Sequence, residues 1–150
     1  MVATPSLSST SGLRSCLGAG IAHGKIYLLG LSSGDPRGNS DHQLEEYDPK
    51  TDTLVARASL TPSRGGYAVA ALDNFIYVLA GRDEQGHRAD LDRYDPQTDS
   101  WVRLPDLPVA RSWPGAVAFD GGLWILGGVS RVWESPDATV EVMRPGAPMP

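Results

Sequence analysis

The segment Tyr47-Asp48-Pro49-Lys50-Thr51-Asp52-Thr53 returns as Tyr94-Asp95-Pro96-Gln97-Thr98-Asp99-Ser100, so positions 47 and 94 begin two copies offset by 47 residues. The same offset relates residues 76–81 (IYVLAG) to residues 123–128 (LWILGG), and residues 26–31 (IYLLGL) form an earlier copy. An internal period of this length is typical of repeat architectures such as propellers. The sequence therefore predicts one structural unit repeated about three times.

Each unit contains the pattern of four short strands. The first strand is small and apolar, and the second is β-branched and aromatic, as in a buried sheet. Between them lie two turn residues that tolerate a positive φ, as tight hairpins require. The third strand ends in Tyr-Asp-Pro, and the fourth begins near Leu54 or Trp101. The expected first strands are residues 18–22, 68–72 and 115–119, followed by His23-Gly24, Asp73-Asn74 and Asp120-Gly121.

These residues resemble the kelch repeat family, whose pattern is a glycine doublet closing the second strand, then a Tyr, then a Trp after six intervening residues. Gly127-Gly128 is a full doublet, and Tyr94 and Trp101 have the family spacing. The first copy departs from the pattern, because Leu54 stands where Trp is expected. The resemblance implies an all-β fold: a kelch-type β-propeller segment of about three four-stranded antiparallel blades. It also implies that Tyr and Trp fill the space between neighbouring blades.

We expect a single kelch-repeat domain over residues 1–150, with blade units at 14–60, 64–107 and 111–145. Residues 1–7 align with residues 101–107, so they are expected to be an outer strand that completes a blade. Three blades alone would leave an unpacked axis in a closed ring. One hypothesis is a homodimer in which two chains form six blades and the N-terminal strand of each chain completes the last blade of its partner. The alternative is a fragment of a longer propeller or a truncated gene product.

The loops after the second and fourth strands are expected to leave the blades on one face. Arginines at such a channel mouth suit carboxylates, and exposed Trp suits an interaction hot spot. A structural role for the repeated Arg, and packing for the Trp residues, stay open as alternatives. The candidate ligand-binding residues on this face are Arg14, Arg64, Arg111, Trp113, Arg82, His87, Arg131 and Trp133.

Composition and residue spacing disfavour several classes of function. The formal net charge of −5 disfavours nucleic acid as a partner. The sequence has no apolar run of about 18 residues, so we expect no membrane span, and a cytoplasmic location is the default expectation. His, Cys and Asp show no metal-ligand spacing, and Cys16 has no identifiable partner base. We therefore expect no metal, no cofactor and no catalytic residues.

Three functions follow from the resemblance. The first is a non-catalytic scaffold that binds a protein or an acidic peptide. The second is a carbohydrate-active kelch enzyme, such as a sialic-acid mutarotase-like protein, for which a sugar acid would be the ligand. The third is a structural remnant. A fold alone does not choose among them.

Overall fold

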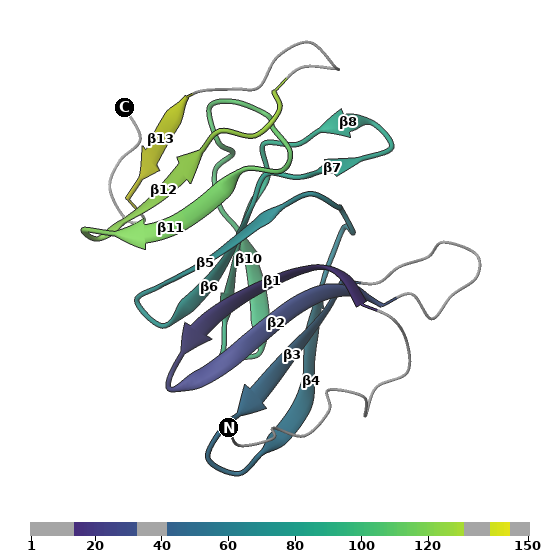
Figure 1. Cartoon of the computed structure of the whole chain (residues 1–150), viewed down its shortest axis with the longest axis vertical. Coiled ribbons are helices and arrows are strands. Elements are labelled where there is room, and N and C mark those ends of the chain that lie inside the picture. Colours follow the sequence, from purple (N-terminus) through teal and green to yellow (C-terminus); the bar gives the residue numbers. More distant parts are fainter. Residues whose placement is uncertain (1–13, 33–41, 131–138, 145–150) are drawn as a thin grey trace, which may run out of the picture.

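The computed structural model describes residues 14–32, 42–130 and 139–144. Over these ranges the regular secondary structure is β-strand, and the main strands group into antiparallel sheets that stack on one another (Figure 1). No helix in the described part of the chain is long and apolar enough to cross a membrane. The all-β propeller-type architecture predicted from the repeat is confirmed.

Blade 1 is a four-stranded sheet in which neighbouring strands follow one another in sequence. Its strands are β1 (Arg14–Ala22), β2 (Lys25–Ser32), β3 (His42–Asp48) and β4 (Thr53–Leu60). Blade 2 repeats this order with β5 (Ala68–Leu72), β6 (Phe75–Leu79), β9 (Leu91–Asp95) and β10 (Ser100–Arg103). The up-and-down connection of four strands is the one that the sequence predicts for each blade.

The loop between the second and third strands of blade 2 has structure of its own. It contains a small hairpin of β7 (Arg82–Asp83) and β8 (Gly86–His87). The four strands per unit that the sequence predicts do not include this hairpin. It holds Arg82 and His87 opposite each other in the same ladder.

Blade 3 has three strands within the described residues: β11 (Gly115–Phe119), β12 (Gly122–Leu126) and β13 (Val140–Met143). The sheet order is β11-β12-β13, so β13 is the outermost described strand. Residues 1–7, which the sequence places as a blade-completing strand, lie outside the described residues.

The predicted hairpin turns have the expected left-handed backbone. Both residues of each turn have positive φ: 49° and 73° at His23 and Gly24, and 52° and 63° at Asp73 and Asn74. The third turn repeats this with 48° at Asp120 and 66° at Gly121. Two consecutive left-handed residues match the twist of the flanking strands, and so these turns set the register of the first two strands in every blade.

Two apolar layers hold the blades together. The layer between blades 1 and 2 contains Leu29, Leu60, Val78 and Tyr94, with Trp101 packed against it. The layer between blades 2 and 3 includes Tyr77, Leu91, Leu107, Leu123 and Ile125. Small first strands allow the close approach: a Cβ at Gly20 would lie only 2.9 Å from Ile76. The expected position of Tyr94 and Trp101 between neighbouring blades is confirmed.

Candidate functional site

The repeated arginine of blade 2 lies inside the protein. Arg64 is 2% exposed, and its Nε donates a hydrogen bond to the carbonyl of Ala80 at 2.7 Å. Its Nη2 lies 2.7 Å from the Asp92 carboxylate and 3.3 Å from the carbonyl of Val78. Arg64 therefore ties the loop that enters the blade to the end of β6 and to β9.

Arg111 repeats this arrangement in blade 3. It is 0% exposed, and its Nη1 donates to the carbonyl of Gly127 at 3.0 Å. Its Nη2 contacts Thr139 Oγ1 at 3.0 Å and the carboxylate of Glu141. These contacts match the structural role that the sequence leaves open for the repeated arginines, in which each arginine holds its own blade together. Ligand binding by Arg64 and Arg111 stays a prediction.

The acidic partners of these arginines were not among the residues predicted from the sequence. Strand pairing places Glu45, Asp92 and Glu141 at the same position, opposite Leu28, Val78 and Ile125. In the sequence, each acid lies two residues before Tyr47, Tyr94 or Met143, which share one repeat position. An acid recurring at one repeat position, together with a recurring arginine, is the sequence signal for the ion pairs Arg64–Asp92 in blade 2 and Arg111–Glu141 in blade 3.

A second carboxylate, Asp90, draws several arginines together. Its side chain is 3% exposed and accepts hydrogen bonds from Arg88 and Arg103. Burial alone would raise the pKa of Asp90, but the hydrogen bonds from Arg103 and Arg88 outweigh it and hold that pKa below its usual value. The charge of Asp90 is thereby kept at neutral pH, and it anchors the loop that leaves β8.

Trp113 and Arg82 form the exposed part of the predicted face. Trp113 is 55% exposed, and the Arg82 guanidinium lies 5.5 Å from the centre of its ring. The backbone N–H of Trp113 donates to the carbonyl of Gly66 at 2.6 Å. A Cβ at Gly66 would lie 3.0 Å from the indole Nε1, so glycine provides the floor on which the ring rests. We call Arg82 and Trp113, with Gly66 beneath, the platform.

Trp113 has a backbone conformation that its side chain disfavours. Its φ is +53°, in the left-handed region. A large residue in this region costs on the order of 1 kcal/mol or more, and such strain is concentrated at functional sites. The exposed ring and the strained backbone together distinguish this tryptophan from one that only fills a core.

His87 lies beside the platform and contacts the residue that precedes Trp113. Its Nδ1 lies 2.8 Å from the hydroxyl of Ser112, the residue before Trp113. Ser112 is buried, and its backbone pairs with Val129 of blade 3. His87 therefore connects the β7–β8 hairpin of blade 2 to the loop that carries the tryptophan, and the structure brings Arg82, His87 and Trp113 together.

The structure does not describe the side chains of the three remaining predicted residues. Arg14 begins β1, where its backbone pairs with Ser32, and the described side chains begin further along that strand. Arg131 and Trp133 lie outside the described residues. Within the ranges that the structure describes, His, Cys, Asp and Glu form no group of three that could hold a metal ion.

Comparison with known proteins agrees with the blade geometry. Residues 63–108 match the model of the Kelch motif. Kelch-like protein 15 of Danio rerio is 38% identical over 80 residues, which is 50% of this chain and 13% of that protein. A solved structure, described as the structure of YjhT, superposes with a TM-score of 0.65 at 23% identity, over 78% of this chain and 35% of the other. The chain thus spans 13% of the length of the first of these proteins and 35% of the second, and its second blade carries a Kelch motif.

Proposed function

We propose that the chain is a non-catalytic binding scaffold, and that the platform of Arg82 and Trp113 is where it holds a protein segment. The observation that carries this proposal is the exposed indole of Trp113, held at a positive φ above Gly66. An aromatic side chain on a rigid, preorganised base is the usual centre of an interaction hot spot. Loops on a rigid scaffold are the usual carriers of such function.

The chemistry of the platform favours an acidic segment. Arg82 is exposed, and its guanidinium offers a planar set of donors that matches a carboxylate. The neighbouring indole offers an apolar face to the rest of the segment. An extended peptide that carries Asp or Glu next to an apolar side chain would satisfy both residues at once.

A sugar acid is the second candidate ligand. Its carboxylate would meet Arg82 in the same way, and its ring would lie on the face of Trp113. This alternative corresponds to the carbohydrate-active function that the kelch resemblance leaves open. The two ligand classes share the carboxylate and differ in length, so a direct comparison of them separates the two functions.

The test is a titration of the chain with acidic peptides and, in parallel, with sialic acid, measured by calorimetry. We expect at least one acidic peptide to bind, and the Arg82→Ala variant to bind it at least tenfold more weakly, a loss of about 1.4 kcal/mol. The matched control is Arg144→Ala, because Arg144 is an exposed arginine whose guanidinium bonds the carbonyl of Asp120 at the far hairpin. Binding of sialic acid without any peptide would instead favour the carbohydrate function.

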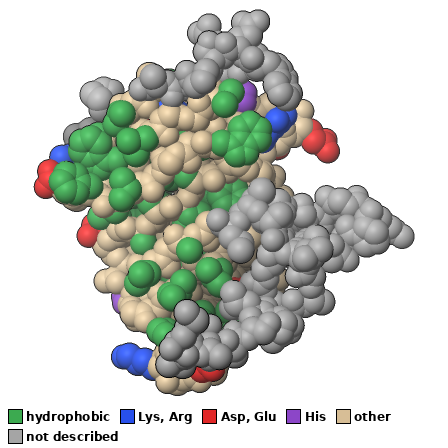
Figure 2. Space-filling model, in the orientation of Figure 1, with side chains coloured by type: hydrophobic (Ala, Val, Ile, Leu, Met, Phe, Trp, Pro, Cys, Tyr) green, Lys and Arg blue, Asp and Glu red, His purple; other side chains and the backbone are tan. Residues whose placement is uncertain are grey.

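We also propose that two chains associate. Figure 2 shows hydrophobic side chains gathered over the sheet of blade 3. On this sheet Trp124 pairs with Val142, and Leu126 pairs with Val140. The repeat offset makes Trp124 and Leu126 equivalent to Tyr77 and Leu79 of blade 2, which belong to the apolar layer between blades 2 and 3. Ile21 on the outer side of blade 1 is 66% exposed. Stacking blade 3 of one chain on blade 1 of another would repeat the internal packing of the blades.

The exposed apolar residues support this association. On blade 3 they are Val117, Phe119, Leu126, Val140 and Val142, each at least 43% exposed. A contiguous apolar surface of this kind marks an interaction site. The test is the mass of the chain in solution. We expect twice the 16.0 kDa of one chain, whereas a folded species of 16.0 kDa at all concentrations would contradict the association.

A further inference from the structure

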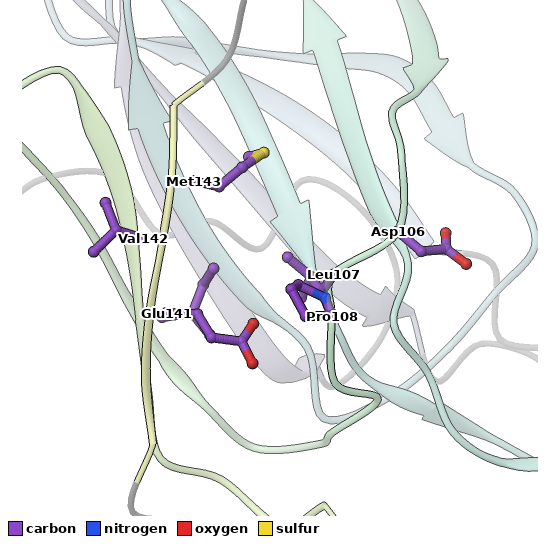
Figure 3. Close-up of a pocket in the computed structure, with 7 residues that line it drawn as sticks. Asp106, Leu107, Pro108, Glu141, Val142 and Met143 are labelled. Atoms are coloured by element: carbon purple, nitrogen blue, oxygen red, sulfur yellow. The ribbon is translucent and has the colours of Figure 1, made fainter. Parts of the chain in front are cut away.

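A groove runs along the outer edge of blade 3. It is lined by Leu107, Pro108, Ile125 and Met143, with Asp106, Glu141 and Val142 at its margins, and its volume is about 190 Å³. Figure 3 shows Leu107 and Pro108 on one side and the β13 residues Glu141 and Met143 on the other. The groove therefore lies between the end of blade 2 and the outermost described strand of blade 3.

The backbone of β13 offers hydrogen bonds along this edge. In an antiparallel ladder, alternate residues direct their N–H and C=O groups toward opposite neighbours. The carbonyl of Thr139 accepts a hydrogen bond from Gly127, which follows β12, so residues 139, 141 and 143 face inward. Val140 and Val142 consequently direct their backbone groups outward, where no described strand pairs with them.

Blade 2 shows what fills the equivalent edge. There β10 pairs with β9, and the N–H of Leu104 donates to the carbonyl of Leu91 at 2.9 Å. Leu91 has the ladder position of Val140, because Leu79 and Leu126 are their respective partners. The outward groups of β13 are therefore those that bind a fourth strand in blade 2.

The position equivalent to the groove, between blades 1 and 2, is filled by a side chain, and we call this position the socket. Between blades 1 and 2, the Trp101 side chain packs against the cluster that holds Leu60, Val78 and Tyr94. The repeat offset carries Leu60 and Val78 onto Leu107 and Ile125, and strand pairing carries Tyr94 onto Met143. These three counterparts line the groove. The groove therefore occupies the position that a fourth-strand side chain fills in blade 2.

The size of the groove fits a side chain better than a free ligand. Sites for drug-sized molecules are about 300–1,000 Å³, and an apolar cavity of about 150 Å³ holds a single benzene ring. At about 190 Å³ the groove takes one large apolar side chain. An added strand supplies that side chain together with the backbone partners that Val140 and Val142 lack among the described residues.

We propose that this edge is a strand-acceptor site, and that its occupant is the segment of residues 1–7 of a second copy of the chain. This inference deepens the proposed association of two chains and rests on it. Residues 1–7 (MVATPSL) align with residues 101–107 (WVRLPDL), with Pro5 on Pro105 and Leu7 on Leu107. The alignment places Met1 in the groove, which is the counterpart of the socket, and an unbranched thioether adapts well to an irregular apolar gap.

Charge and register agree with this occupant. Residues 1–7 carry no acidic side chain, so the carboxylates of Asp106 and Glu141 at the groove margins do not repel them. In blade 2, Val102 pairs with Arg93, and Arg93 has the ladder position of Val142. The proposal therefore predicts a specific pair between chains, with Val2 of one copy opposite Val142 of the other.

The first experiment removes the outward N–H of β13. In the full chain, Val142→Pro deletes this donor while leaving the inward ladder to β12, and proline is tolerated on edge strands. The matched control is Ala56→Pro, because Ala56 is exposed on β4 and has the corresponding outward position in blade 1. We expect Val142→Pro to weaken dimer formation at least tenfold relative to Val142→Ala, which removes the same exposed apolar side chain but keeps the backbone N–H. Deletion of residues 2–7 should have a similar effect, and Ala56→Pro should leave dimer formation unchanged.

The second experiment is a cross-link. Two chains, each with Cys16→Ser, carry Val2→Cys in one and Val142→Cys in the other, and they are mixed under oxidising conditions. A disulfide between the two chains is expected, whereas Val2→Cys mixed with Val55→Cys on β4 should give none. The cross-link reports strand donation directly, even where a proline variant folds poorly.

The outcomes separate the two proposals. A wild-type dimer that loses affinity in Val142→Pro and forms the predicted disulfide supports strand donation. A wild-type dimer that is unaffected by Val142→Pro and by the deletion, and that forms no disulfide, overturns strand donation but leaves the association intact. A wild-type chain that is monomeric at every concentration overturns both.

Discussion

The indole Nε1 of Trp101 donates a hydrogen bond to the backbone carbonyl of Ala58 at 2.8 Å, and this contact joins blade 2 to blade 1. The same ring packs against Tyr94, with 5.1 Å between the ring centres. The family aromatic residues thus connect neighbouring blades as well as filling space. A kelch repeat is therefore completed by its neighbour, which explains why the unit occurs in series.

Truncating this tryptophan should weaken the protein. Trp101 is half-buried, so Trp101→Ala is expected to lower the free energy of unfolding by about 3 kcal/mol, the low end for a large aromatic residue. Trp101→Phe keeps the ring packing and loses the hydrogen bond to Ala58, which costs about 1 kcal/mol. Urea unfolding of both variants checks the order, and equal losses would contradict a role for the hydrogen bond.

The buried arginine of blade 2 should be more sensitive than the exposed one. Removing Arg64 leaves the buried Asp92 without the guanidinium 2.7 Å from it, so Arg64→Ala should cost about 3–5 kcal/mol. Arg82→Ala, at an exposed position, should cost less than about 1 kcal/mol. Thermal and urea unfolding measure both. Similar small losses would show that Arg64 does not hold the blade together.

Two glycines with similar backbone conformations give a matched test of close packing. Gly81 has φ +118° and Gly86 has φ +122°, so alanine at either position carries a similar backbone cost. A Cβ at Gly81 would lie 2.9 Å from the carbonyl of Gly65, whereas a Cβ at Gly86 meets nothing within 4 Å. Each substitution should cost about 1–3 kcal/mol from backbone strain, and Gly81→Ala should cost more. Equal losses in unfolding experiments would contradict the close approach at Gly81.

Acid should destabilise the protein through Glu46. This carboxylate is 4% exposed and accepts hydrogen bonds from Tyr27 at 2.8 Å, from Lys25 and from Arg57. Burial would raise the pKa of Glu46, but these hydrogen bonds lower it below its ordinary value. A carboxyl with a lower pKa in the folded state stabilises the protein above the unfolded pKa of about 4.3. That contribution is lost as the pH falls through the folded pKa.

The measurement for Glu46 is the free energy of unfolding as a function of pH. Between neutral pH and about pH 3 the wild-type protein should lose more stability than Glu46→Gln, because the variant has no proton to take up at this site. At neutral pH the Glu46→Gln variant should be less stable than the wild-type protein, because the variant lacks the ion pair between Glu46 and Arg57. Parallel pH profiles for the two proteins would contradict the lowered pKa.

The repeat and its strands could be predicted from the sequence because packing and turn chemistry recur at fixed positions. Asp73-Asn74 and Asp120-Gly121 predict left-handed turns from residue type alone. The expected first strands at residues 68–72 and 115–119 are those observed. The fold therefore follows from local rules that agree with one another in each repeat.

The candidate site was predicted less completely, because burial depends on contacts distant in sequence. Arg64 and Arg82 both lie in loops on the predicted face, but only the fold places Asp92 beside Arg64 and leaves Arg82 exposed. The β7–β8 hairpin was missed because its strands have two residues each, too short to show a period. The positive φ of Trp113 has no sequence signal, since tryptophan rarely adopts it.

The most direct test of the proposed function is to measure binding and stability on one variant, Trp113→Gly. Glycine removes the exposed ring and adopts the φ of +53° without strain, so the free energy of unfolding should change by less than about 1 kcal/mol. Calorimetry with an acidic peptide that binds the wild-type chain should show at least tenfold weaker binding to this variant. Unchanged peptide binding by a folded Trp113→Gly protein would contradict the platform as the binding site.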